Sequence, residues 1–200
     1  MLAADEVQQV REGLWCWQRF QPSVKVDCAS TAIRVGTQLI FVDPIPLATE
    51  ALAELTSQAE PAAIVVTNGN HDRAVSQLRS KFKIPVIAHT AAIAELGFAA
   101  DQTVSDGEVL LDALRVITLP GAGGGEIALH DPRGWLILGD ALINLERDGL
   151  ALLPEKYCTD AIEMRRSLRK LLRFPSEVLT FAHGLPLVSR VGPRLQALLA

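Results

Sequence analysis

A short apolar run that ends in a polar corner constrains the fold of this 200-residue chain more than any other feature. Residues 63–66 (Ala-Ile-Val-Val) are all apolar, which predicts a short buried strand. Turn-forming residues follow at 67–70 (Thr-Asn-Gly-Asn), and residues 74–79 then carry apolar side chains at helical spacing. Polar side chains therefore gather at a strand-to-helix corner, where open α/β sheets usually carry their functional sites.

This corner resembles the metal-binding loop of the metallo-β-lactamase-fold hydrolases, whose motif reads Thr-His-x-His-x-Asp-His at the end of a buried strand. Thr67 and Asp72 match the motif. His71 falls on a variable position, so it is interpreted as a surface or loop histidine. Three positions hold other residues in place of the motif's histidines: Asn68, Asn70 and Arg73. The frame of the loop is kept, whereas most of its ligands are replaced.

Other segments extend the resemblance along nearly the whole chain. The family's second metal loop reads Pro-Gly-His-Thr-Pro-Gly, and Ala122 stands at the histidine position here. A Gly-Asp pair after a strand matches at Asp140, and a His-Gly pair after the last strand matches at His183. Asp43, at the end of a strand, resembles a structural aspartate of the family. Only Asp72, Asp140 and His183 then match the family's metal ligands.

The resemblance implies a four-layer αββα sandwich, with the site where two helix-covered sheets meet at one edge. The pattern alone predicts one α/β or α+β domain over residues 1–200, since no linker or low-complexity segment interrupts it. Strands are predicted over 13–20, 32–35, 38–42, 63–66, 85–88, 109–111, 114–118, 127–130, 135–138 and 178–181. Helices are predicted over 47–58, after Asp72 up to Ile84, and over 91–96, 159–172 and 193–200.

Composition and charge exclude several classes of protein. A net charge of −4 without a long basic run argues against nucleic acid or an anionic membrane as a partner. No apolar run is long enough to span a membrane. The three cysteines lack paired spacing, which indicates a reducing compartment and no cysteine zinc cluster. Because the N-terminus has no signal-peptide pattern, we expect a cytoplasmic protein.

The residues that replace the motif's ligands set the expected chemistry. Zinc prefers imidazole, thiolate and carboxylate ligands, whereas Asn68 and Asn70 offer only neutral amide oxygens. Arg73 is permanently cationic and opposes metal binding beside it. We therefore expect no metal cofactor, and we expect Arg73 to bridge Asp72 and Asp140. On this hypothesis Arg73→Ala destabilises the fold by about 3 to 5 kcal/mol.

Two functions remain open. The first is a degenerate protein without dinuclear zinc hydrolase activity and without a confident catalytic residue, which binds or scaffolds an unidentified small molecule or protein. The alternative is a mononuclear hydrolase of an ester, thioester or phosphoester, in which Asp72, Asp140 and His183 hold one zinc, manganese or iron ion. Each residue also has a structural alternative, Asp72 as a helix cap and the others as turn residues. The oligomeric state is unknown, and a purely oligomeric structural protein would need a large exposed apolar face.

Other conspicuous residues have ordinary interpretations. His89 and His130 lie beside or within predicted strands, which indicates structural roles. Gly121 and residues 123–125 resemble a phosphate cradle, but the run leads into a strand and not a helix. It is therefore interpreted as a flexible remnant of the second metal loop. A basic cluster is typical of a solvated helix face: Arg165, Arg166, Arg169 and Lys170.

Overall fold

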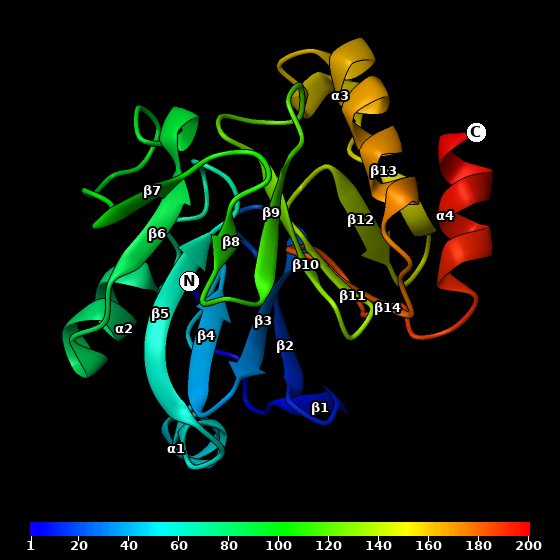
Figure 1. The fold of residues 1–200 in the computed structure, drawn as a ribbon. Helices are drawn as coiled ribbons and strands as arrows, with labels where there is room; N and C mark the ends of the chain where they lie inside the picture. Colours follow the sequence, from blue (N-terminus) through cyan, green and yellow to red (C-terminus); the bar gives the residue numbers. More distant parts are fainter.

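The computed structural model describes residues 1–200 and contains two β-sheets with helices on their outer faces (Figure 1). The first sheet has seven strands in the order β1 to β7, of which β1–β4 run antiparallel and β4–β7 run parallel. Its strands are β1 (Gln8–Arg11), β2 (Leu14–Gln21), β3 (Val26–Val35), β4 (Gln38–Val42), β5 (Glu60–Val66), β6 (Val86–His89) and β7 (Gln102–Val104). The predicted strand over 63–66 is therefore the buried end of β5.

The second sheet has five strands in the order β14-β11-β10-β9-β8. Only the β11–β14 pair is parallel. Its strands are β8 (Val109–Leu110), β9 (Leu114–Thr118), β10 (Ile127–Asp131), β11 (Trp135–Leu138) and β14 (Val178–Thr180). A separate hairpin pairs β12 (Leu142–Leu145) with β13 (Gly149–Leu152).

Four α-helices and three short 3-10 segments complete the chain. The α-helices are α1 (Thr49–Thr56), α2 (Val75–Phe82), α3 (Ala161–Leu168) and α4 (Val191–Leu199). The 3-10 segments are η1 (Thr90–Ala92), η2 (Glu155–Tyr157) and η3 (Arg169–Arg173). Asp160 caps α3 by accepting hydrogen bonds from the backbone N–H groups of Ile162 and Glu163. None of the helices combines the length and the apolar character that crossing a membrane requires.

Three apolar clusters define the layers. One cluster contains side chains of both sheets, such as Ile40 and Leu129, and fills the space between them. The second packs α1 and α2 against the first sheet through residues such as Leu55 and Leu78. The third packs α3 and α4 against the second sheet, and these helices lie together on one side of Figure 1. The layers confirm the predicted four-layer αββα sandwich.

Several predicted elements differ from the structure. The helix expected over 91–96 is a single 3-10 turn, because so short a segment gains too few hydrogen bonds to offset helix nucleation. The helix expected over 159–172 narrows to 3-10 geometry from Arg169 onward, as helices often do in their last turns. Four short strands were not predicted, because most of their side chains are exposed or half-buried and form no buried apolar run: β1, β7, β12 and β13.

The two sheets are joined directly at the edge where β5 and β14 end. The backbone N–H of Ala29 donates to the carbonyl of Ala182 at 2.8 Å, and that of Ile127 donates to the carbonyl of Thr67 at 2.8 Å. The first bond holds the segment after β14 against β3, and the second holds the loop after β5 against the second sheet. Polar residues that follow strands of both sheets therefore meet at one edge.

Candidate metal centre

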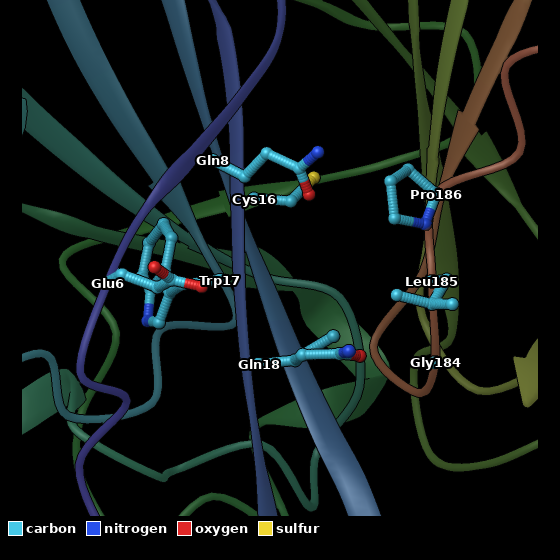
Figure 2. A pocket seen from close by; sticks show the side chains of 9 residues that line it. Glu6, Gln8, Cys16, Trp17, Gln18, Gly184, Leu185 and Pro186 are labelled. Carbon is cyan, nitrogen blue, oxygen red and sulfur yellow. The ribbon is translucent and has the colours of Figure 1, made fainter. Parts of the chain in front are cut away.

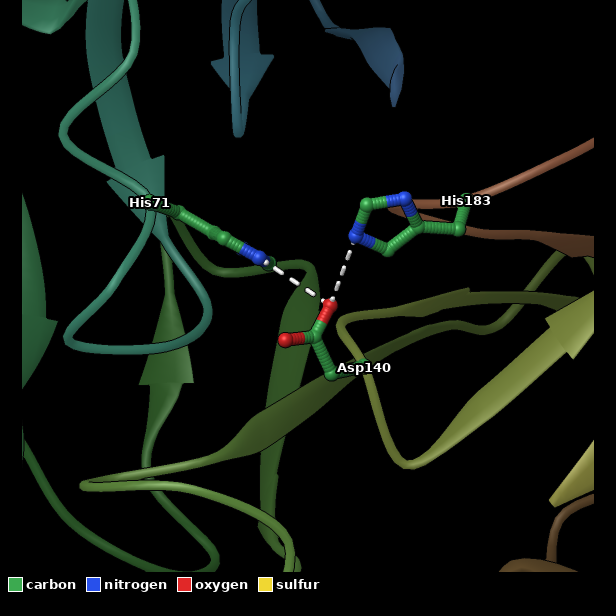
Figure 3. A group of neighbouring side chains, drawn as sticks. All are labelled: His71, Asp140 and His183. Carbon is green, nitrogen blue, oxygen red and sulfur yellow. Dashed lines mark hydrogen bonds and ion pairs between the residues drawn. The ribbon is translucent and has the colours of Figure 1, made fainter. Parts of the chain in front are cut away.

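His71, Asp140 and His183 converge at this edge, one from the first sheet and two from the second (Figure 3). The possible ligand atoms of the three side chains all lie within 4.8 Å of one another. Oδ1 of Asp140 is 3.1 Å from Nε2 of His71 and 3.2 Å from Nε2 of His183. One carboxylate oxygen thus faces two imidazoles.

The other ring nitrogen of each histidine, Nδ1, contacts an oxygen atom of the protein. Nδ1 of His71 lies 3.1 Å from Oδ2 of Asp43. Nδ1 of His183 donates to the backbone carbonyl of Asp27 at 2.9 Å. Histidines that bind metals usually bond their second nitrogen to a carboxylate or a carbonyl in this way, which fixes the ring and directs the free nitrogen. Both rings therefore present Nε2 to Asp140 in a fixed orientation.

Asp43 anchors the loop that carries His71. Its carboxylate is 2% exposed and accepts a hydrogen bond from the backbone N–H of Thr67 at 2.8 Å and another from the Thr67 hydroxyl. With His71, three contacts satisfy this buried carboxylate. The resemblance of Asp43 to a structural aspartate therefore agrees with its position at the end of β4.

The charges of the three groups are strongly coupled to their surroundings. Burial and Arg73 oppose the charged form of His71, but the carboxylates of Asp140 and Asp43 outweigh them and raise its pKa to about 10. Burial likewise opposes the charged form of His183, yet its contact with Asp140 raises the pKa to about 9. Burial would raise the pKa of Asp140, but the two imidazoles hold it well below its usual value. Without a metal, both imidazolium groups therefore pair with Asp140, and that of His71 also pairs with Asp43.

His71 lies in the loop after β5, as the sequence analysis expected, but it is not a surface histidine. The residue is 3% exposed and lies in the centre, whereas the motif-matching Asp72 is exposed. Oδ1 of Asp72 accepts a hydrogen bond from the backbone N–H of Arg73 at 2.7 Å, and Asp72 does not belong to the group formed by His71, Asp140 and His183. A positive φ of 29° at Arg73 accompanies this turn of the chain. The sequence signal for His71 is its place beside Asp72, one position away from the motif's aspartate.

The expected bridge from Arg73 to Asp72 and Asp140 is also wrong. The Arg73 guanidinium instead donates to three backbone carbonyls: Ala29 at 2.7 Å, Asp43 at 3.1 Å and Ala182 at 3.3 Å. The side chain is half-buried at the edge where β3, the end of β4 and the segment after β14 meet. A planar guanidinium with five N–H donors suits several converging carbonyls. Arg73 therefore clamps the backbone.

The remaining replaced positions supply no metal ligand. The amide of Asn68 is buried and donates from Nδ2 to Oε2 of Glu126 at 2.6 Å. Asn70 is exposed, and its backbone N–H donates to Oδ1 of Asn68 at 3.0 Å. Ala122 is fully buried in the apolar cluster beneath α3 and α4.

Glu126 is a buried acid that the sequence analysis missed. It is 2% exposed, and its Oε1 accepts a hydrogen bond from the backbone N–H of Ala141 at 2.9 Å. Burial, together with the charge of Asp140, raises its pKa to about 8. The only sequence signal is a charged residue directly before an apolar strand, which is common at exposed strand ends.

The glycine run has a packing reason. A Cβ on Gly124 would lie 2.4 Å from the carboxylate of Glu95, and one on Gly125 would lie 2.4 Å from the backbone nitrogen of Ala92. The segment that includes η1 therefore covers the loop, and this close approach requires glycine. Because Gly124 and Gly125 pack closely against this segment, the run does not form an open phosphate cradle.

The histidines outside the centre have structural contacts. Nδ1 of His89 accepts a hydrogen bond from the backbone N–H of Ala91 at 3.1 Å. His130 lies in β10 and packs on Phe174, with ring centroids 4.9 Å apart. These contacts agree with the structural interpretation of both residues.

A small cavity borders the centre without including its three residues (Figure 2). Its volume is about 110 Å³, and it lies between the strands β1–β2 and the segment that follows His183. The lining residues are Glu6, Gln8, Cys16, Trp17, Gln18, Ala29, Gly184, Leu185 and Pro186. The cavity is therefore a neighbour of the centre and not its opening.

The donor set fits one divalent cation. Two imidazoles and one carboxylate are ligands that zinc and several transition metals accept. The side chains of Asp140 and His183 are 18% and 17% exposed, so solvent reaches one side of the group.

Comparisons with known proteins agree with the fold. The structure of the DIM-1 metallo-beta-lactamase aligns with a TM-score of 0.78 at 17% identity, covering 97% of this chain and 96% of that one. A metallo beta lactamase from Erythrobacter litoralis aligns with a TM-score of 0.77 at 19% identity, covering 96% and 95%. No curated protein matches the sequence. The family model of the metallo-beta-lactamase superfamily matches residues 8–192, so the chain belongs to this superfamily.

Proposed function

We propose that this chain is a hydrolase that works with one divalent metal ion, bound by His71, Asp140 and His183. The observation that carries the proposal is the orientation of both imidazoles, each held at Nδ1 and directed at Asp140 through Nε2. A divalent cation bound there would supply Lewis acidity and lower the pKa of a water molecule that it binds. The substrate class proposed is an ester, a thioester or a phosphoester.

The protein residues then have distinct tasks. Asp43 and the carbonyl of Asp27 hold the two imidazoles and keep each proton on Nδ1. Oδ1 of Asp140 faces both rings, which leaves Oδ2 to accept a hydrogen bond from water and orient it towards a substrate. The partial exposure of Asp140 and His183 gives a substrate access to that side.

The proposal includes the loss of dinuclear zinc chemistry. The Asn68 amide is committed to Glu126, Asn70 is exposed and Ala122 is part of an apolar core. With no donors for a second ion, the reaction must rely on a single metal. This differs from the sequence-based alternative in one ligand, since His71 takes the part that Asp72 was expected to have.

Metal content measured by elemental mass spectrometry tests the proposal. The protein is purified without chelator or affinity tag and offered zinc, manganese and iron. We expect about one equivalent in the wild type and in Asp72→Ala, and none in His71→Ala or Asp140→Ala. The metal-loaded protein is then screened for turnover of esters, thioesters and phosphoesters. Two equivalents, or one equivalent that survives His71→Ala, would overturn the proposed ligand set.

A second candidate is a metal-free binding or scaffolding protein. It is favoured by the ion pairs that already satisfy the three side chains, since both imidazoles lie within 3.2 Å of one carboxylate oxygen. In that case the cluster is a structural substitute for a metal. A protein that takes up no metal, but melts at a lower temperature when His71 or Asp140 is changed, would support this candidate over the hydrolase.

A further inference from the structure

We infer that Glu126, together with Asn68, is a positioning pair that fixes the two ligand-bearing loops against each other before any ion binds. Its effect on metal binding rests on the proposed function, whereas its effect on the loops does not. Both side chains are buried, at 2% and 1% exposure, and neither binds the proposed metal.

Glu126 connects the two loops through its two oxygens. Oε2 accepts from Nδ2 of Asn68 at 2.6 Å, three residues before His71. Oε1 accepts from the backbone N–H of Ala141 at 2.9 Å, directly after Asp140. One carboxylate therefore joins the loop after β5 in the first sheet to the loop after β11 in the second.

The Asn68 amide can make this contact in only one orientation. Its Oδ1 accepts from the backbone N–H of Asn70 at 3.0 Å, so Nδ2 must be the group that faces Glu126. A flipped amide would place a donor against the N–H of Asn70 and an acceptor against a carboxylate. Hydrogen-bond geometry thus assigns each atom of the amide.

Two glycines provide the space that the pair occupies. A Cβ on Gly123 would lie 2.4 Å from Nδ2 of Asn68, and one on Gly139 would lie 2.6 Å from Oε1 of Glu126. Any larger residue at either position would displace the amide or the carboxylate. The pair and its two glycines are therefore mutually dependent.

The pair lies next to two positions at which the family motif places metal ligands. Asn68 and Ala122 stand at histidine positions of that motif, and Glu126 follows the second metal loop. In this chain a buried amide–carboxylate contact joins the two loops without requiring an ion. Fixed ligand geometry raises metal affinity because less ordering remains to be done on binding.

A reciprocal exchange of the two groups separates the hydrogen bond from the identity of the residues. Glu126→Gln places an N–H donor against either Asn68 or Ala141, and Asn68→Asp places two carboxyl groups together. The double variant Asn68→Asp with Glu126→Gln restores every donor–acceptor contact with the direction of one bond reversed. It also keeps the number of acidic side chains. Glu95→Gln is the matched control, because Glu95 is an exposed acid beside the same loop.

Two readouts are measured for all five proteins: zinc affinity by calorimetry and the melting temperature of the metal-free form. We expect each single variant to bind zinc about 10- to 100-fold more weakly and to melt roughly 5 °C lower. The double variant should recover both values to within about threefold in affinity, and the control should match the wild type.

The outcomes distinguish this inference from the proposed function. Single variants with wild-type zinc affinity would overturn the positioning role, even if they melt earlier. A double variant as impaired as the singles would overturn the hydrogen-bonded pairing. If the wild type binds no zinc, the proposed function fails, and the melting temperatures of the metal-free proteins alone then decide whether the pair fixes the loops.

Discussion

The two sheets contribute to the centre in different ways. In the second sheet, Asp140 and His183 follow β11 and β14 within three residues, and both face the centre as the family motif predicts. In the first sheet, the motif predicts Asp72 and Arg73 as the inward residues, but His71 is the one that faces the centre. The same kind of match was therefore right on one side and wrong on the other.

The difference teaches what a motif position determines. Directly after a strand, the pleat and the pairing with neighbouring strands fix which way a side chain points. In the loop after β5, the direction depends on contacts that no motif records, such as the bonds from Thr67 and His71 to Asp43. A loop can keep its residue types and still rotate by one position.

The largest effect on stability is expected at Asp43, whose contacts hold the loop after β5 in the orientation that differs from the motif. Asp43→Ala removes the acceptor of three buried donors and leaves the imidazolium of His71 with only one carboxylate. We expect a loss of about 3 to 5 kcal/mol in the free energy of unfolding, measured with urea. Asp5→Ala is the control, because its carboxylate is exposed. A loss below about 1 kcal/mol would mean that the loop does not depend on Asp43.

The next effect concerns His71 as a ligand. Removing a residue that only orients a ligand usually costs 10- to 100-fold in metal affinity, so His71→Ala should cost more than about 100-fold. His89→Ala is the control, since His89 is a histidine with its own hydrogen bond away from the centre. Zinc titration with a competing chelator measures both. Equal zinc affinities for the two variants would mean that His71 is not a ligand, and would favour the loop orientation that the motif predicts.

Much of the fold could be predicted because it depends on local patterns. The apolar runs of β5, β9, β10 and β11 predicted buried strands, and the family match then supplied the four-layer arrangement. The site could be predicted only where a residue ends a strand. His71 and Glu126 could not, because their roles depend on partners 69 and 15 residues away in sequence, Asp140 and Ala141. Such pairings depend on tertiary packing, which periodicity does not report.

Arg73 provides a third and smaller effect. Arg73→Ala removes three hydrogen bonds from a cation to carbonyls that join both sheets. We expect a loss of about 2 kcal/mol, since the side chain is only half-buried. Arg79→Ala, which removes a surface pair with Asp101, is the control and should change stability by less than about 1 kcal/mol.

The same variant separates the clamp from the bridge that was expected. A clamp acts on backbone carbonyls, so the effects of Arg73→Ala and Asp140→Ala on stability should add within about 0.5 kcal/mol. If Arg73 and Asp140 instead formed a bridge, the double variant would lose clearly less stability than the sum of the losses in the two single variants. The double-mutant cycle therefore decides which contact Arg73 makes.

The pH dependence of the metal-free protein is a fourth, more modest effect. The folded pKa values of His71 and His183, about 10 and about 9, lie above the unfolded value of 6.5. Their contribution to stability is therefore complete below about pH 6.5 and is lost as the pH rises to 10. The pKa of Glu126 is raised from 4.5 to about 8. Its contribution to stability is therefore also lost as the pH rises, between about pH 4.5 and pH 8.

Melting curves at pH 6, 8 and 10 would show this trend, and His71→Gln should flatten its upper part. Metal affinity should change in the opposite direction, because both imidazoles must lose a proton before they bind an ion. Metal-free stability that rises from pH 6.5 to pH 10 would contradict the ion pairs with Asp140.

The smallest expected effect is at Asp72, and it tests the comparison most directly. Its carboxylate is exposed and contacts only the backbone N–H of Arg73, so Asp72→Ala should change stability by less than about 0.5 kcal/mol. Metal affinity should stay within about twofold, since the residue faces away from the centre. Asp72→Asn, which keeps a hydrogen-bond acceptor for Arg73, separates the loss of charge from the loss of that bond.

A large loss of metal affinity in Asp72→Ala would have a specific structural meaning. The loop would have to rotate when the ion binds, so that Asp72 replaces His71 and the motif describes the loaded state. Such a rotation would break the contact between His71 and Asp43 and change the backbone at Arg73, where φ is positive. Asp43→Ala would then still lower the melting temperature of the metal-free protein, but this loss would not be matched by a loss of metal affinity. If metal affinity is unchanged in Asp72→Ala but falls in His71→Ala, the ligand lies one residue earlier in the chain than the motif predicts.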